Sequence, residues 1–342
     1  MVDALRTLYA ALMALSSVAS VFGNLLLLMV LLFNKELRSD TLGLTLSFLL
    51  SDMAQGLCII SGGAHNSLSR PEGYPSESPF CQGSGFIFLL LQTSSIQSLT
   101  WATVDKFTEI CFALSYSSIW TARRSRAVLV LIWLFCLVNA TLPLLGFGSY
   151  AYSESRYLCS PSFTPKNMYF VLLWMLLGIV VPILTMCSLY GYIVYVARKQ
   201  ARRGTFMCND LHCFYVPANN YLRSSIVMVT TSVCLLVCWL PYISVCLYET
   251  FSGQHSPAVS SSLSTWLVLT SAALNPWITC LTHTRYRAAM RQSICRFIQR
   301  CSTIGTPLAS RPQSSTFQLD VTNRISTTAV SPLPSPETPM PQ

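Results

Sequence analysis

Long apolar runs alternate with short polar segments along the chain as far as about residue 282. The runs fall near residues 8–33, 42–62, 86–108, 127–148, 168–196, 224–248 and 262–282. A helix needs roughly 20 apolar residues to cross the hydrocarbon core of a bilayer, and each run reaches that length. The pattern therefore predicts an all-α membrane protein, a seven-transmembrane helix bundle over residues 8–282 preceded by a short extracellular N-terminus, residues 1–7.

The composition agrees with a membrane protein. Of the 342 residues, 52% are hydrophobic and only 10% are charged, whereas a soluble domain carries about 25% charged residues. The first apolar run is too long for a signal peptide, and no basic segment precedes it, so we expect it to be a retained membrane anchor.

The distribution of basic residues predicts the orientation of the bundle. All but four of the 22 lysines and arginines fall in loops on the same side as the C-terminus; the exceptions are Arg6, Arg70, Arg156 and Lys166. Because positively charged loops stay in the cytoplasm, we expect an extracellular N-terminus and a cytoplasmic C-terminus in the plasma membrane. The net charge of +9 then lies mainly beside anionic lipid and does not indicate nucleic-acid binding.

The residues after the seventh run form two predicted regions. Apolar and basic residues in 283–301 fall on different faces of a helix, which predicts a short amphipathic eighth helix lying in the membrane interface. Cys295 and Cys301 are then candidates for palmitoylation. Residues 302–342 are rich in Ser, Thr and Pro and are predicted to be a disordered cytoplasmic tail with hydroxyls accessible to kinases.

The cysteines predict one disulfide bond. Most of the 14 cysteines fall within the apolar runs, where cysteine behaves as a small apolar residue, whereas Cys81 and Cys159 fall in the outside loops. We therefore expect Cys81, at the start of the third helix, to pair with Cys159 in the second outer loop.

Polar residues also occur at membrane depth. Asn24 and Asp52 lie within apolar runs, where an ionisable group is costly and indicates a functional site. The alternative is a buried polar contact that only fastens helices together.

Sequence motifs occur in a fixed order along the predicted helices. They are Gly23-Asn24, Asp52, Cys81, Asp105-Lys106-Phe107, Trp133, Cys159, Pro182, Tyr190, Cys238-Trp239-Leu240-Pro241 and Asn275-Pro276. Over about residues 10–300 this order resembles the rhodopsin-like, class A G-protein-coupled receptors. The prolines independently indicate kinks or hinges in three helices, used either for movement or for static packing.

The resemblance implies two polar sites. Asn24, Asp52, Ser95 and Asn275 match a water-filled pocket that can hold a sodium ion, with Asp52 and Ser95 as the nearest ligands. The alternative is a protonated Asp52 with no ion. At the cytoplasmic side, Asp105, Lys106 and Tyr190 match the positions that couple the receptor to heterotrimeric G proteins.

The chain departs from the family at its switch. Lys106 stands where the family usually has Arg, Thr279 where it has Tyr, and no acid occurs near Tyr221 at the start of the sixth helix. Lysine lacks the planar fork of arginine. These departures predict a weakly held resting state with ligand-independent basal signalling.

The predicted ligand pocket is mostly apolar. The seventh helix has no lysine for a retinal Schiff base, and Phe88 replaces the acid with which amine receptors bind their ligands. A lipid, a neutral small molecule or a peptide end suits such a pocket, although each aromatic residue could equally serve helix packing. The expected lining is Phe88, Gln92, Trp239, Tyr242, Thr265 and Trp266.

The sequence thus predicts an orphan class A receptor with a heterotrimeric G protein, and possible arrestin and receptor kinases, as partners. One alternative is a weakly coupling or decoy receptor. A membrane transporter is the other, but inverted repeats are not detectable. The sequence offers no paired carboxylates, nucleophile motif or metal-ligand cluster for an enzyme.

Overall fold

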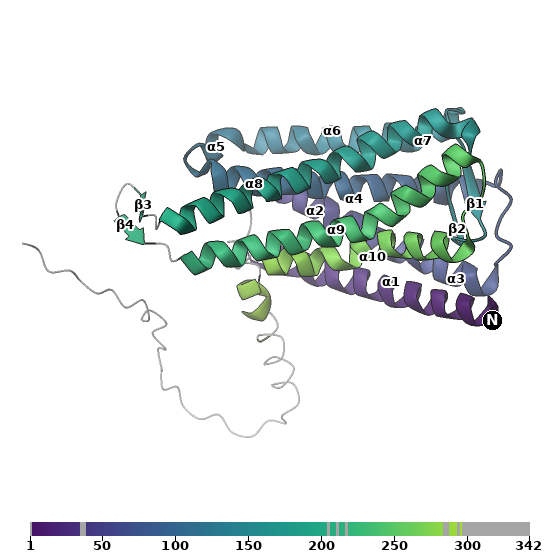
Figure 1. Cartoon of the computed structure of the whole chain (residues 1–342), viewed down its shortest axis with the longest axis horizontal. Coiled ribbons are helices and arrows are strands. Elements are labelled where there is room, and N and C mark those ends of the chain that lie inside the picture. Colours follow the sequence, from purple (N-terminus) through teal and green to yellow (C-terminus); the bar gives the residue numbers. More distant parts are fainter. Residues whose placement is uncertain are drawn as a thin grey trace, which may run out of the picture. The chain divides into compact units, whose positions relative to one another are not determined.

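The computed structural model describes residues 2–34, 39–203, 206–209, 212–215, 218–282, 287–292 and 295. Long helices lie side by side, and the N-terminus lies at the end of the bundle that carries strands β1 and β2 (Figure 1). The predicted all-α bundle is confirmed. Its seven helical stretches are α1 (Val2–Phe33), α2 (Leu42–Ala54) continued by η2 (Gln55–Ile60) and α3 (Ser61–Ser69), α4 (Pro79–Cys111), α6 (Ala122–Thr141) continued by η4 (Leu142–Leu145), α7 (Met168–Met175) continued by η6 (Leu176–Val180) and α8 (Val181–Arg203), α9 (Ala218–Ser252), and α10 (Ala258–Thr282).

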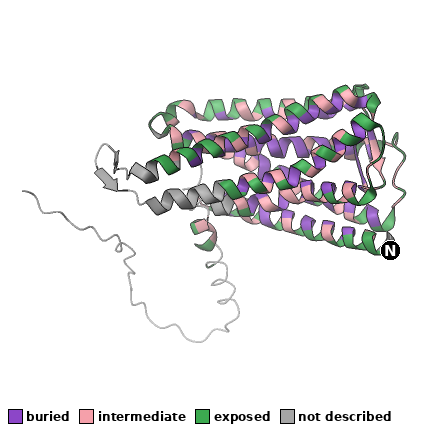
Figure 2. Ribbon diagram, viewed as in Figure 1, coloured by how far each residue is buried: buried purple, intermediate pink, exposed green. Residues whose placement is uncertain are grey.

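Two of the seven stretches are less apolar than the rest. Among the described residues, five helical spans are long and apolar enough to cross a membrane by length and composition alone, and these do not include α4 and α10. Both helices carry many buried polar side chains, such as Gln92 and Ser95 on α4 and Asn275 on α10. Buried residues line the sides of the helices that face one another (Figure 2), so these polar groups contact protein rather than lipid.

The first helix begins earlier than the apolar pattern predicts. Residues 2–7, expected as a short extracellular N-terminus, form the first turns of α1, so the helix starts before the apolar run; the extracellular placement stays a prediction. Their sequence contains good helix formers. The next turn is anchored because the Tyr9 hydroxyl donates to the Arg156 carbonyl oxygen at 3.1 Å and its ring packs 5.5 Å from that of Tyr157.

Capping residues likewise extend other helices beyond their apolar runs. The Ser78 hydroxyl accepts a hydrogen bond from the Cys81 backbone N–H, and Pro79 occupies the first turn of α4. The Thr121 hydroxyl accepts one from the Arg124 N–H at the start of α6. Both contacts satisfy backbone donors that a helix start leaves free.

Two helices contain wide π-helical turns, η2 and η6. Segment η6 ends at Val180, two residues before Pro182, which has no N–H to donate to the preceding turn. The Ser17 hydroxyl of α1 donates to the Gly56 carbonyl of η2 at 2.8 Å, and the Ser20 hydroxyl donates to the Asp52 carbonyl in the preceding turn of α2 at 2.9 Å. Side chains of α1 thus satisfy carbonyl groups at this wide turn.

The two β-hairpins were not predicted from the sequence. Strand β1 (Tyr150–Ser153) pairs antiparallel with β2 (Leu158–Pro161), so that Tyr152 lies opposite Cys159. Strand β3 (Phe206–Asn209) pairs with β4 (His212–Tyr215) in the same way. Both hairpins fall in loops where the hydrophobic pattern contains no strand-length alternation.

The predicted eighth helix is described only in part. Residues 287–292 and 295 are helical, and Met290 packs against a cluster of Leu27, Leu31, Phe48 and Leu49. Cys295 is exposed. Cys301 and the predicted tail, 302–342, lie outside the described residues.

Candidate functional site

A disulfide bond joins α4 to the β1–β2 hairpin. The Cys81 and Cys159 sulfurs are 2.04 Å apart and their Cα atoms 5.4 Å apart, so the structure contains the bridge that the cysteine pattern predicts. We name this side of the bundle the disulfide end. The opposite side, where α4 carries Asp105, is the Asp105 end.

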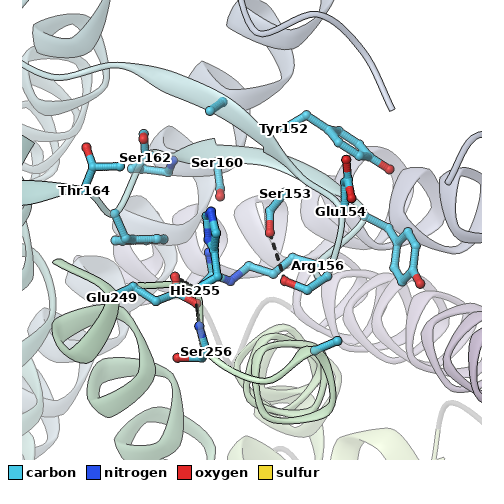
Figure 3. Close-up of a pocket in the computed structure, with 16 residues that line it drawn as sticks. Tyr152, Ser153, Glu154, Arg156, Ser160, Ser162, Thr164, Glu249, His255 and Ser256 are labelled. Carbon is cyan, nitrogen blue, oxygen red and sulfur yellow. Dashed lines mark hydrogen bonds and ion pairs between the residues drawn. The ribbon is translucent and has the colours of Figure 1, made fainter. Parts of the chain in front are cut away.

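A buried ion pair adds a second link at the disulfide end. The Arg156 guanidinium, in the turn of the hairpin, lies 2.5 Å from Glu249 of α9, and each side chain is only 5% exposed. The second oxygen of Glu249 accepts a hydrogen bond from the Ser261 hydroxyl at 3.0 Å and from the Ser256 N–H at 3.3 Å. Arg156, Glu249 and Ser256 line one cavity of about 580 Å³, and Figure 3 shows them in this cavity. Sequence reasoning missed this pair, whose partners are 93 residues apart.

An aromatic residue just after β2 enters the bundle. Phe163 is 7% exposed, and its ring centroid lies 6.4 Å from Trp174 of α7 and 6.2 Å from Tyr242 of α9. The Arg156 guanidinium carbon lies 4.8 Å from the same ring centroid. A loop residue thus belongs to the same buried cluster as Phe88 and Trp239.

The structure buries most of the predicted ligand pocket and turns one member away. Phe88, Gln92, Trp239, Tyr242 and Thr265 are each at most 2% exposed. The side-chain oxygens of Gln92 and Thr265 are buried without a hydrogen-bond partner. Trp266 is only partly buried and donates its indole N–H to the Ser16 hydroxyl of α1 at 3.1 Å, so its polar edge faces α1.

The predicted polar switch surrounds Asp52, which is fully buried. One carboxylate oxygen accepts from the Ser95 hydroxyl at 2.5 Å, and the other accepts from the Asn275 amide at 2.6 Å. The Asn24 amide nitrogen instead donates to the carbonyl oxygens of Ser20 and Ala272 at 2.8 and 3.0 Å. Three of the four predicted residues therefore contact directly, whereas Asn24 joins α1 to α10 and leaves its own side-chain oxygen without a partner.

A network of hydrogen bonds holds the Asp105 carboxylate. It accepts from the Tyr116 hydroxyl of the short helix α5 (Tyr116–Ile119) at 2.7 Å and from the Thr41 hydroxyl at 3.1 Å. Burial, and then the bond to Asp105, raises the pKa of the Tyr116 phenol above its ordinary value. The hydroxyl therefore stays protonated at neutral pH and remains a donor.

The comparisons with known proteins identify the family. Residues 23–278 match the family described as the 7 transmembrane receptor, rhodopsin family. This chain belongs to that family. The rhodopsin family is class A of the seven-transmembrane receptors, so the chain is a multi-pass membrane receptor. The family is one of receptors and not of enzymes.

Similar proteins include receptors of different kinds. The receptor is 25% identical to the human histamine H2 receptor over 279 residues, which are 81% of this chain and 76% of that one. It is 26% identical to a Gq-coupled rhodopsin of Mizuhopecten yessoensis over 226 residues, 63% of this chain but only 45% of that rhodopsin. The crystal structure of squid rhodopsin has the same fold, with a TM-score of 0.67, 19% identity and coverage of 87% of this chain and 88% of that one.

The receptor's altered switch residues make short-range contacts. Lys106 forms an ion pair with Glu109 at 2.7 Å and lies 3.7 Å from Asp105. The Tyr190 hydroxyl shares a hydrogen bond with the Thr103 hydroxyl at 3.0 Å, which joins α8 to α4. The side chains of Tyr221 and Thr279 lie outside the described part of the receptor.

Sequence reasoning missed a set of serines beside Asp52. Ser51 pairs with Ser94 at 2.7 Å, and Ser47 pairs with Ser98 at 2.8 Å. The indole of Trp133 on α6 also donates to Ser47 at 3.0 Å. The signal was available, because serines four residues apart on each of two helices present matching hydroxyls on one face.

Proposed function

We propose that this receptor lies in the plasma membrane with the disulfide end outside, and that it signals to heterotrimeric G proteins from the Asp105 end. The difference between the two ends is the observation that supports the proposal. A disulfide bond and a buried ion pair link segments at one end, whereas Lys106 is held by a partly exposed neighbour at the other. A receptor needs this arrangement if a soluble partner is to engage an inner face that opens.

We also propose ligand-independent basal signalling. Glu109 lies on the same helix as Lys106, so their ion pair can persist when helices separate and does not hold the inner face closed. This intrahelical ion pair therefore contributes little to the closed state. A contact made by a charged group contributes roughly 1.5–3 kcal/mol against about 0.5–1.5 for a neutral hydroxyl contact. Loss of a closing charge contact should outweigh loss of the tyrosine hydroxyl at Thr279.

An assay of ligand-free second messengers tests the proposal. Wild-type receptor, Lys106→Ala and untransfected cells are compared at matched surface expression. We expect a signal above background in wild type that Lys106→Ala removes, because the variant lacks the cation that would contact a G protein. Arg126→Ala is the matched control, since Arg126 is an exposed cation whose side chain donates to the Ala122 carbonyl. A wild-type signal equal to that of untransfected cells would favour a weakly coupling or decoy receptor.

A sodium ion beside Asp52 is a second proposal, on the same receptor. The carboxylate of Asp52 and the hydroxyl of Ser95 are oxygen donors already in contact, and the side-chain oxygen of Asn24 is buried and unpartnered nearby in the bundle. Oxygen donors suit a hard cation. Asp52 and Ser95 would hold the ion, which would supply a positive charge that stabilises the carboxylate.

Thermal unfolding of purified receptor tests this site apart from signalling. Replacing sodium chloride by choline chloride at constant ionic strength should lower the Tm of wild type. Asp52→Asn should remove the dependence on sodium while preserving surface expression. An equal sodium response in wild type and Asp52→Asn would place any sodium effect elsewhere.

We also propose a class of ligand, a lipid modification and further protein partners. A lipid, a neutral small molecule or a peptide end would bind among Phe88, Gln92, Trp239, Tyr242 and Thr265, each of which is buried. Cys295 is exposed and would accept a palmitoyl group, as would Cys301. Arrestin and receptor kinases would act on the Ser/Thr-rich residues 302–342.

A further inference from the structure

We propose that the segment from Arg156 to Phe163 is a built-in ligand of this receptor: Phe163 fills the apolar ligand pocket, and the Arg156–Glu249 ion pair locks it there. The inference rests on the proposed signalling function and names what occupies its ligand site. It is carried by three features of the disulfide end, which are the packing of Phe163, the geometry of the ion pair and the anchoring of the hairpin.

The packing of Phe163 resembles that of a bound aromatic ligand. Its ring stacks against Trp174 and meets Tyr242 edge-on, the two arrangements that aromatic rings prefer. Trp174 is itself fixed, because its indole N–H donates to the Thr93 hydroxyl of α4 at 3.1 Å. Phe163 therefore bridges α7 and α9 from a position outside both helices.

The ion pair holds this ring in place. Arg156 contacts Glu249 through its guanidinium and covers the face of Phe163 at 4.8 Å, a combination for which a planar guanidinium is suited and a lysine is not. Glu249 is also fixed by Ser256 and Ser261. The lock thus joins the hairpin to α9, to α10 and to the loop between them.

The hairpin is anchored on its other side as well. Cys159 of β2 is bonded to Cys81 of α4, and the Tyr150 hydroxyl of β1 donates to the Ala140 carbonyl of α6 at 2.8 Å. Gly85 of α4 is needed for this packing, since a Cβ there would lie 2.6 Å from the Tyr150 ring. The hairpin that carries the built-in ligand is therefore fixed to α4 and α6, and these two helices can stay in place while α9 tilts.

These contacts on α9 favour the signalling state of the receptor, so the segment acts as an agonist. Tyr242 follows Pro241, the proline inside α9, so Phe163 contacts α9 at a hinge position. Glu249 draws the disulfide-end half of α9 toward the anchored hairpin. Because α9 is stiff on each side of the hinge, inward tilt of that half swings the other half outward and opens the Asp105 end.

The cavity beside the lock indicates how a diffusible molecule would compete. It measures about 580 Å³ and is lined by Arg156, Phe163, Glu249 and His255 (Figure 3). A molecule that entered here and displaced the segment would need an aromatic ring for the site of Phe163 and a cation for Glu249. Such an aromatic cation would replace the built-in ligand rather than bind beside it.

Cys246 provides a native reporter of occupancy. It is fully buried, lies one turn from Tyr242 on α9 and belongs to the same cluster as Phe163. A membrane-impermeant thiol reagent is applied to intact cells, and labelling in the Cys246→Ala background is subtracted. Wild type should resist labelling at Cys246, and Phe163→Ala should be labelled.

Basal signalling is measured on the same cells. Phe163→Ala should lower it about tenfold, the change expected when a two-state equilibrium loses one good aromatic contact. Phe163→Leu keeps an apolar side chain, so its basal signalling should lie between that of wild type and that of Phe163→Ala. Tyr169→Ala is the matched control, because Tyr169 is an aromatic residue of α7 that is 83% exposed.

The two readouts separate failure of the built-in ligand from failure of the proposed function. Equal labelling of Cys246 in wild type, Phe163→Ala and Phe163→Leu would overturn the inference, as would basal signalling that is unchanged or higher in both variants. A wild-type receptor with no basal signal would instead contradict the proposed function, and labelling would still decide whether Phe163 closes the pocket.

Discussion

The two ends of the bundle are held by contacts of different kinds. At the disulfide end, a covalent bond and a buried ion pair join residues 78 and 93 positions apart. At the Asp105 end, Tyr116 bonds to Asp105 from eleven residues away, and the Lys106–Glu109 side chains are 30% and 44% exposed. Exposed ion pairs are screened by salt, whereas buried pairs are screened much less. The disulfide end therefore serves as a fixed frame, whereas the Asp105 end can rearrange at a small cost in free energy.

The largest expected effect comes from breaking the buried ion pair. Glu249→Gln leaves the Arg156 charge buried without a counter-charge, which should lower the free energy of unfolding by about 3–5 kcal/mol. Thermal unfolding of the purified receptor measures the loss. The double variant Arg156→Met with Glu249→Met removes both charges and should recover most of it. A loss below about 1 kcal/mol for the single variant would show that this pair is not part of a rigid frame.

The disulfide bond should contribute slightly less. Replacing both cysteines, Cys81→Ser with Cys159→Ser, should cost about 2–5 kcal/mol because the unfolded chain is no longer constrained. Reducing agent should lower the Tm of wild type by the same amount and leave the double variant unchanged. Cys58→Ser is the control, since Cys58 is an exposed free thiol. If reducing agent lowered the Tm of the double variant as well, the stabilising disulfide would not be the Cys81–Cys159 bond.

At the Asp105 end we expect a smaller effect on stability and a visible effect on signalling. Asp105→Asn removes the negative charge but keeps one acceptor oxygen, so the hydrogen bonds from Tyr116 and Thr41 weaken from charged to neutral ones, a loss of about 1 kcal/mol each. The short helix α5 should then loosen, and basal second-messenger levels should rise. Surface expression at the wild-type level distinguishes this result from misfolding. An unchanged basal level would mean that this network does not restrain the switch.

The smallest effect should follow from Glu109→Gln. The partly exposed pair with Lys106 is worth less than about 1 kcal/mol and should weaken further as salt is raised. Unfolding measured at low and high ionic strength checks both statements, with the buried Arg156–Glu249 pair as the salt-insensitive reference. A large, salt-independent loss would remove the contrast between the two ends.

The parts of this receptor that could be predicted from sequence are those governed by local pattern. Apolar runs long enough to span a bilayer determine the helices, and the placement of cysteines relative to those runs determines the disulfide bond. The start of α1 was missed because residues 2–7 are helical without being uniformly apolar. Trp266 was assigned to the pocket by position on its helix, but its indole turns to Ser16 on another helix.

The built-in contacts could not be predicted for a different reason. Arg156 and Phe163 lie in a loop with no periodicity, and their partners Glu249, Trp174 and Tyr242 become neighbours only when the hairpin folds back into the bundle. A charged residue in an outer loop is ordinarily exposed. The sequence carries no local sign that this one is buried. By contrast, the serines at 47, 51, 94 and 98 were detectable from their spacing.

Those serine pairs give the α2–α4 contact an electrical property. In both Ser51–Ser94 and Ser47–Ser98, either hydroxyl can be the donor, so each bond can reverse direction by rotation of two O–H groups while the helices stay still. Ser51 precedes Asp52 in the chain. The contact is thus a set of small dipoles that can reorient, as solvent dipoles do, when the charge beside them changes.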